Sequence, residues 1–199
     1  MIQFDEKTHT YTLDGVEIPS VTHICRFLAY DYKSDRPWLA AEAARRGTAI
    51  HEACALIDYG EEPEETPEIS GYLKAYRRFL SDYQPDWELI EHPMGDIELG
   101  YAGTLDRYGV IGDRPCILDI KTGQIHPASV QAQLTAYKFL FPHEYNSIRL
   151  FALKLCNGGT YVLIEFEPDY VLFSYCLYIN RVVERKKKRY ERRTDPLQL

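Results

Sequence analysis

Hydrophobic and polar positions in the first half of the chain predict one hairpin and three helices. The segment YTLDGVEIP alternates as two short strands joined at Asp14 and Gly15, residues that tolerate the positive φ of a tight turn. A short helix is predicted from a cap at Ser20 through Phe27, and longer helices from about Pro37 to Tyr59 and from about Ile69 to Tyr83. Apolar spacing predicts the inward positions of the helix that begins at Pro37: Leu39, Ala43, Ala44, Ile50, Cys54 and Ile57.

The second half of the chain is predicted to be rich in strands. A small meander is expected first, with strands at Trp87–Glu91, Gly100–Tyr108 and Pro115–Lys121. There follow a helix over about Ala128–Phe141, strands at Ser147–Lys154 and Thr160–Phe166, and a final helix that starts near Pro168. This order predicts a mixed central β-sheet flanked by helices, an α/β or α+β fold. Since no repeat or long linker divides the chain, residues 1–199 are interpreted as one domain with a basic C-terminal helix over 181–199.

Composition narrows the class of protein. A chain of 199 residues that is 45% hydrophobic and 27% charged is neither disordered, collagen-like nor a disulfide miniprotein. No apolar stretch approaches the roughly 20 residues of a membrane span, and the polar N-terminus lacks the pattern of a signal peptide, so a cytoplasmic protein is expected. The cysteines form no CxxC pair and are expected to be buried free thiols: Cys25, Cys54, Cys116, Cys156 and Cys176.

Charge is distributed unevenly along the chain. Residues 181–199 carry eight Lys or Arg against three acids, a net charge of +5, so residues 1–180 carry −12. The run RKKKRYERR contains Lys186, Lys187 and Lys188, which are candidates for contacts with the phosphates of a nucleic acid. A solvated helix end is the alternative interpretation, and charge alone does not choose between the two.

The segment CILDIKTG brings a carboxylate and an amine to one place. Strand alternation puts Asp119 and Lys121 on one face with Ile117, and it turns Leu118 and Ile120 to the other. The preceding strand contains GTLD, so Asp106 lies beside Asp119 if the two strands pair. Two close carboxylates favour a bound cation, and an adjacent ammonium suits a phosphodiester or an attacking water. A surface Asp/Lys pair on an edge strand is the alternative.

Two helical segments add candidate side chains. In RRGTAIHE, His51 is a third candidate ligand for the same cation, and Arg45 and Arg46 supply positive charge for phosphate. In QAQLTAY, Gln133 and Tyr137 share one helical face and offer an amide and a phenol. A structural helix histidine and a packed core tyrosine are the corresponding alternatives.

Taken in order, RGTAIHE, GTLD, LDIKTG and QLTAY resemble the motifs of the PD-(D/E)XK nuclease superfamily, in its RecB-like branch. The opening IPSVTHI resembles the lead-in of phage exonucleases and of the mitochondrial genome maintenance exonuclease. The resemblance implies a restriction-endonuclease-like core and a Mg²⁺- or Mn²⁺-dependent DNA nuclease. It implies metal ligands at His51, Asp106, Asp119 and the Ile120 carbonyl, catalysis by Lys121, and DNA positioning or site support by Gln133 and Tyr137. Glu52, Glu91 and Glu98 are alternatives for one further carboxylate.

The sequence also bears on cofactors, partners and alternative functions. Cys156 and Cys176 stand twenty residues apart, so no iron-sulfur cluster is expected, and no phosphate-binding loop for ATP is present. The expected partners are DNA ends or single strands, together with a recombination or single-strand-binding protein, in recombination, repair or phage DNA metabolism. The alternatives to an exonuclease are a structure-specific or nicking endonuclease, and a catalytically idle DNA-binding or inhibitor protein of the same fold.

Overall fold

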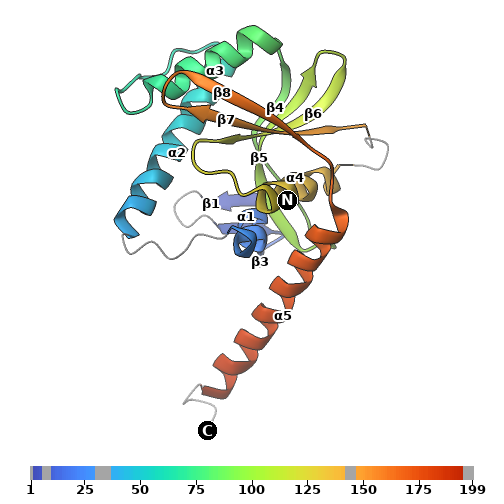
Figure 1. Ribbon diagram of the computed structural model, residues 1–199. Helices are drawn as coiled ribbons and strands as arrows, with labels where there is room; N and C mark the ends of the chain where they lie inside the picture. Colours follow the sequence, from blue (N-terminus) through green and yellow to red (C-terminus); the bar gives the residue numbers. More distant parts are fainter. Residues whose placement is uncertain (1, 6–9, 30–36, 142–146, 195–199) are drawn as a thin grey trace.

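A five-stranded mixed sheet with helices on both faces forms the centre of the protein (Figure 1), which confirms the predicted fold class. The computed structural model describes residues 2–5, 10–29, 37–141 and 147–194. Strands lie in the order β4-β5-β6-β7-β8, and all neighbours are antiparallel except β6 and β7. Their bounds are β4 Asp86–Asp96, β5 Tyr101–Ile111, β6 Arg114–Lys121, β7 Arg149–Cys156 and β8 Thr160–Phe166.

Two hydrophobic layers enclose this sheet, because the central strands bury both faces. In β6, Ile117 joins one core cluster while Leu118 and Ile120 join the other, as strand alternation requires. The second cluster packs under α2 (Pro37–Asp58) and α3 (Ser70–Tyr83). The first packs under α1 (Val21–Cys25), α4 (Pro127–Phe139) and α5 (Tyr170–Thr194). Since α4 connects the parallel pair β6 and β7, it crosses the face that carries Ile117.

A separate three-stranded sheet precedes α1 and packs against the start of β5. It consists of β1 (Ile2–Asp5), β2 (Thr10–Leu13) and β3 (Val16–Ile18), all antiparallel. The predicted hairpin is confirmed, with Asp14 and Gly15 at φ values of 50° and 81°. The predicted cap is also confirmed, since the side chain of Ser20 accepts a hydrogen bond of 3.0 Å from the amide of His23. A 3-10 turn, η1 (Arg26–Leu28), follows α1.

The structure corrects several boundaries and one set of core positions. Leu39, Ala43 and Ala44 are exposed, so their predicted inward placement is wrong; Ile50 is the first fully buried side chain described in α2. The reason is that only the second half of this helix packs on the sheet and α3, which apolar spacing cannot reveal. Strand β4 is longer than predicted, and α4 ends at Phe139.

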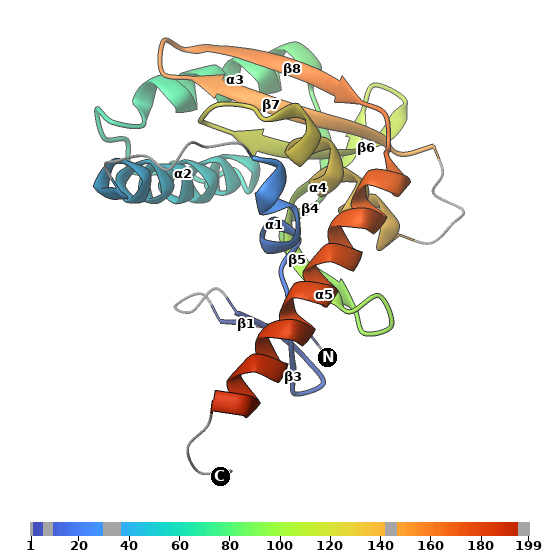
Figure 2. The same cartoon turned by 60° about the horizontal axis from the view of Figure 1, so that its bottom comes forward.

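The cysteines match their prediction in part. All five cysteines are free, and four are buried, whereas Cys156 is only partly buried. None of the helices in the described part of the chain has the length and apolar content to span a membrane. Figures 1 and 2 show α5 continuing beyond the five-stranded sheet.

Candidate metal centre

Three carboxylates lie level with one another across β4, β5 and β6. The paired ladder of β5 and β6 ends at Arg107 and Leu118, and Asp106 and Asp119 are the next residues of the two strands beyond that pair. The register between β4 and β5 steps from Ile90–Arg107 to His92–Leu105, so Glu91 lies level with Asp106. Glu91 has a left-handed backbone with φ of 44°, a costly conformation for a residue with a side chain.

His51 of α2 completes this cluster from the helical layer. Its Nδ1 lies 3.4 Å from Oε1 of Glu91 and 3.6 Å from Oδ2 of Asp106. Its Nε2 lies 3.0 Å from the carbonyl oxygen of Ile120. Donation from Nε2 to this carbonyl leaves Nδ1 facing the two carboxylates, so Nδ1 can carry a proton there or give its lone pair to a cation. One donor atom from each of His51, Glu91 and Asp106 lies within 4.8 Å of the others.

The close approach of several carboxylates shifts the pKa values of the residues in this cluster. Burial raises the pKa of Asp106 to about 6, and the neighbouring carboxylates Asp119 and Glu91 contribute to this rise. Burial alone lowers the pKa of His51, but the carboxylates of Asp106 and Glu91 outweigh burial and raise it to about 9. Burial likewise opposes the ionisation of Glu91, but contacts with His51 and Arg107 lower its pKa overall. In the metal-free protein a protonated His51 therefore neutralises part of this charge.

The donor set fits a divalent cation. One imidazole nitrogen and two carboxylate oxygens converge, and oxygen-rich sites of this kind suit Mg²⁺ or Mn²⁺. The sequence offers Glu52, Glu91 and Glu98 as alternatives for one further carboxylate ligand, and the structure places Glu91 beside His51 and Asp106. The backbone of Ile120 contacts two residues of the centre. Its carbonyl oxygen contacts Nε2 of His51, and its amide donates to Oδ2 of Asp106 at 2.7 Å.

Lys121 lies beside this centre in a fixed orientation. Its Nζ donates to Oδ1 of Asp119 at 2.9 Å and to Oε1 of Gln133 at 3.1 Å, and it also lies 2.8 Å from Oδ2 of Asp119. Burial lowers the pKa of Lys121, but the carboxylates of Asp119 and Asp106 outweigh burial and raise it. The amine is therefore a charged ammonium that donates hydrogen bonds.

Gln133 and Tyr137 of α4 share one helical face, as their spacing predicts, but they contact different groups. Gln133 holds Lys121, whereas the hydroxyl of Tyr137 donates to the carbonyl of Thr104 in β5 at 2.7 Å. The hydroxyl of Tyr11 in the small sheet lies 2.8 Å from Oγ1 of Thr104. Tyr137 thus anchors the strand that carries Asp106 and does not contact Lys121 itself.

A buried ion-pair network lies behind the centre, and sequence reasoning missed it. The guanidinium of Arg107 is fully buried and donates to Asp58 at 2.6 Å, to Glu91 at 2.8 Å and to the carbonyl of Asp106 at 2.6 Å. The hydroxyl of Tyr76 donates to the same Asp58 carboxylate at 2.7 Å. Arg107 thereby fixes Oε1 of Glu91, the atom that also faces His51. The available signal was a charged residue directly after Asp106, which alternation turns to the opposite side of the strand.

Arg45 and Arg46, which the sequence predicts to supply positive charge for phosphate, lie on a different face of α2 from His51. Arg45 and Arg46 line a groove of about 370 Å³ on another face of α2, together with Glu52, Glu64 and Glu68. Arg46 forms an ion pair of 3.7 Å with Glu68. The structure therefore does not bring these two arginines to His51. Lys186 and Lys187 are exposed near the end of α5, and the side chain of Lys188 lies outside the described part.

Comparison with known proteins finds similarity among solved structures. No protein-family model and no curated protein matches the chain. Among solved structures, the chain is similar to "LHK-Exo in complex with dAMP", with 14% identity, a TM-score of 0.37, and coverage of 90% of this chain and 94% of that one. It is also similar to an alkaline exonuclease, LHK-Exo from Laribacter hongkongensis, with 13% identity, a TM-score of 0.38, and coverage of 92% and 95%.

Proposed function

We propose that this protein is a Mg²⁺- or Mn²⁺-dependent nuclease that hydrolyses DNA phosphodiesters. One observation carries the proposal: the donors of His51, Glu91 and Asp106 converge beside a charged Lys121 that Asp119 and Gln133 hold in place. A cation site next to an oriented ammonium suits a reaction in which negative charge develops on a phosphate. The resemblance of the four sequence motifs to the PD-(D/E)XK superfamily and its RecB-like branch supports the same assignment.

Each side chain has a distinct part in this proposal. His51 through Nδ1, Glu91 and Asp106 hold the cation, with Asp119 as the fourth candidate ligand. When bound, the cation supplies polarisation of the phosphate and acidification of a water molecule. The ammonium of Lys121 contacts both carboxylate oxygens of Asp119 and Oε1 of Gln133, which fix its position beside the candidate cation site. From there its positive charge would orient the attacking water or stabilise charge on the phosphate.

The finer assignment is an exonuclease that acts in DNA recombination, repair or phage DNA metabolism. Since the same centre serves both end-dependent and internal cleavage, the assay compares end-labelled linear, covalently closed circular and single-stranded DNA with Mg²⁺. An exonuclease degrades the linear duplex, the single strand or both, and leaves the circle intact. Cleavage of the circle would assign an endonuclease instead.

Asp119→Ala tests the centre itself. The variant is expected to lose cleavage on every substrate while its circular dichroism spectrum stays unchanged. Glu52→Gln is the matched control, because Glu52 follows His51 directly but is exposed and lines the other groove of α2, so activity should stay at the parental level. Near-parental activity of Asp119→Ala would contradict the assignment. Ca²⁺ should bind without supporting turnover, because its larger and looser coordination shell positions the reactants less tightly.

A further inference from the structure

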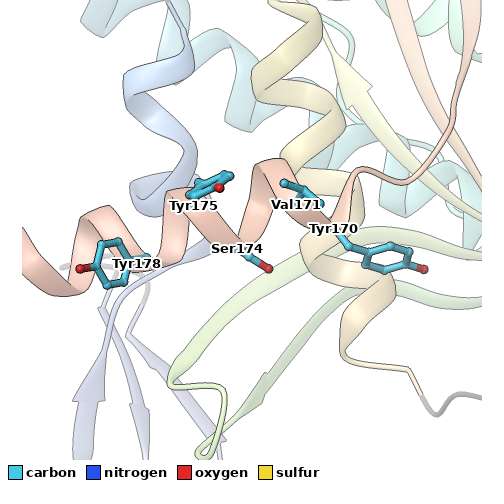
Figure 3. A pocket seen from close by; sticks show the side chains of 5 residues that line it. All are labelled: Tyr170, Val171, Ser174, Tyr175 and Tyr178. Atoms are coloured by element: carbon cyan, nitrogen blue, oxygen red, sulfur yellow. The ribbon is translucent and has the colours of Figure 1, made fainter.

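The two faces of α5 differ sharply in their surroundings. On the inward face, Phe173, Cys176 and Asn180 are buried against the body of the protein. On the outward face, Tyr170, Val171, Ser174, Tyr175 and Tyr178 line an open hollow of about 540 Å³ (Figure 3). Tyr175 and Tyr178 are 64% and 66% exposed, which is unusual for two large rings one helical turn apart. This outward surface, from Tyr170 to Tyr178, is here called the tyrosine face.

The tyrosine face leads directly into the basic end of the same helix. Steps of three and four residues run from Tyr175 to Tyr178, Val182, Arg185 and Arg189, so these positions share one stripe. Arg185 and Arg189 are exposed, as are Lys186 and Lys187 beside them. One helix therefore presents aromatic rings and then cations along a single line.

Charge and ring chemistry together identify the occupant. The basic end carries +5 on a chain whose remainder carries −12, so this end favours a polyanion more than the average surface of the remainder does. A nucleic acid supplies both a continuous anionic backbone and flat rings. Only unpaired bases offer their faces for stacking on tyrosine, whereas the bases of a duplex stack on one another.

The helix α4 links this surface to the candidate metal centre. Gln133 of α4 holds Lys121, while Gln131 and Thr135 of the same helix hold the segment that leads into α5. The side chain of Gln131 donates to the carbonyl of Glu167 at 2.9 Å, and Oγ1 of Thr135 accepts from the amide of Asp169 at 3.0 Å. The start of α5 is therefore fixed relative to the centre, and the basic end extends outward from it (Figure 2).

We propose that the outward face of α5 binds single-stranded DNA, with Tyr175 and Tyr178 stacking on unpaired bases and Arg185 and Arg189 contacting phosphates. The proposal rests on the proposed nuclease function and adds to it the strand form that the protein holds. In this proposal the bases stack on the part of α5 nearest the body of the protein, and the phosphates contact the outer, basic part of the helix.

The test measures equilibrium binding of the full-length chain to a fluorescent oligo(dT) and to a labelled duplex of equal length, with EDTA present so that neither is cleaved. Tyr175→Ser combined with Tyr178→Ser should weaken oligo(dT) binding at least ~10-fold and leave duplex binding unchanged, since stacking requires unpaired bases. Replacing both by Phe should preserve the affinity, because the rings remain. Tyr59→Ser is the matched control, since Tyr59 is equally exposed but lies outside α5.

The phosphate contacts are tested with the double variant Arg185→Gln and Arg189→Gln. Loss of two phosphate contacts should reduce the salt slope of oligo(dT) binding by about 1.4 and should also weaken duplex binding. If the double serine variant does not fold by circular dichroism, Tyr178→Ser alone is measured, with a loss of at least ~3-fold expected.

Three outcomes overturn the proposal: unchanged oligo(dT) affinity in the folded serine variant, an equal loss for the duplex, or sedimentation showing that the face instead joins two copies of this chain. The nuclease assignment is judged separately. Asp119→Ala should bind oligo(dT) like the parent, so retained cleavage in that variant refutes the metal centre without affecting the result for α5.

Discussion

Replacing Arg107 by Met should be among the most destabilising single changes in this protein. The Arg107 side chain is 0% exposed and its partner Asp58 1%, so neither charge is solvated in the folded state. Methionine fills similar space without donors, and it leaves the carboxylates of Asp58 and Glu91 facing an apolar group. Breaking a buried ion pair by removing one partner costs about 3–5 kcal/mol, because the remaining charge is uncompensated. This is a large part of the ~5–15 kcal/mol that stabilises a typical domain.

The assay is urea denaturation of the metal-free protein, with Arg149→Met as the control. Arg149 donates two hydrogen bonds to one carboxylate, Glu165, at 2.7 and 2.8 Å, but the side chains of this pair are 35% and 45% exposed. An exposed pair contributes about 0–1 kcal/mol, so the control should lose far less. Asp58→Asn added to Arg107→Met should recover part of the loss, because it removes the unpaired charge. If Arg107→Met cost no more than Arg149→Met, the reasoning from burial would be refuted.

The pH dependence of this loss follows from Asp58. Burial raises the pKa of Asp58, and the nearby Arg107 and Tyr76 only partly offset that rise. A carboxyl whose folded pKa is raised costs stability once it ionises, so its destabilising effect is absent at low pH and grows as the pH rises. Without Arg107 the pKa of Asp58 rises further. The stability deficit of Arg107→Met should therefore be smaller at about pH 5 than at about pH 8. A deficit independent of pH would show that charge is not its cause.

Three further predictions concern the centre and the packing of the sheet. Lys121→Ala should lower the cleavage rate by at least ~100-fold and leave the Mn²⁺ affinity within about threefold of the parent. Lys121→Arg should not restore the rate, because the planar guanidinium places its charge differently from an ammonium. Full activity of the arginine variant would show that only diffuse positive charge is needed. Glu91→Gln should weaken Mn²⁺ binding in calorimetry at least ~10-fold, and unchanged binding would remove Glu91 from the ligand set. Gly71→Ala should cost about 3 kcal/mol or more in urea denaturation, because the added Cβ would lie 1.7 Å from the carbonyl oxygen of Asn157, whereas Gly158→Ala meets nothing within 4 Å and should be near neutral.

Local sequence was sufficient for the elements whose cause is local. The turn at Asp14 and Gly15 depends on residues that tolerate positive φ, and the cap at Ser20 depends on one side chain and an amide three residues away. The alternation within CILDIKTG was likewise sufficient to put Asp119 and Lys121 on one face. In each case the determining interactions span only a few residues.

Choices between equivalent candidates required the tertiary structure. Glu52, Glu91 and Glu98 are equally plausible as sequence, and only the register between β4 and β5 brings Glu91 level with Asp106. The exposure of Leu39 depends on where α2 leaves the sheet, which its apolar spacing does not encode.

The centre itself shows why sequence alone reaches only part of the site. His51, Glu91, Asp106 and Lys121 come from α2, β4, β5 and β6, and the sequence could name three of these as candidates from their motifs. Their distances depend on strand register and on how a helix packs over a sheet, which are set by contacts between residues far apart in the chain. The burial of Arg107, which fixes Glu91, is a consequence of the same packing. Residue chemistry and local periodicity were therefore determined by the sequence directly, whereas the convergence of the donors was decided by non-local packing.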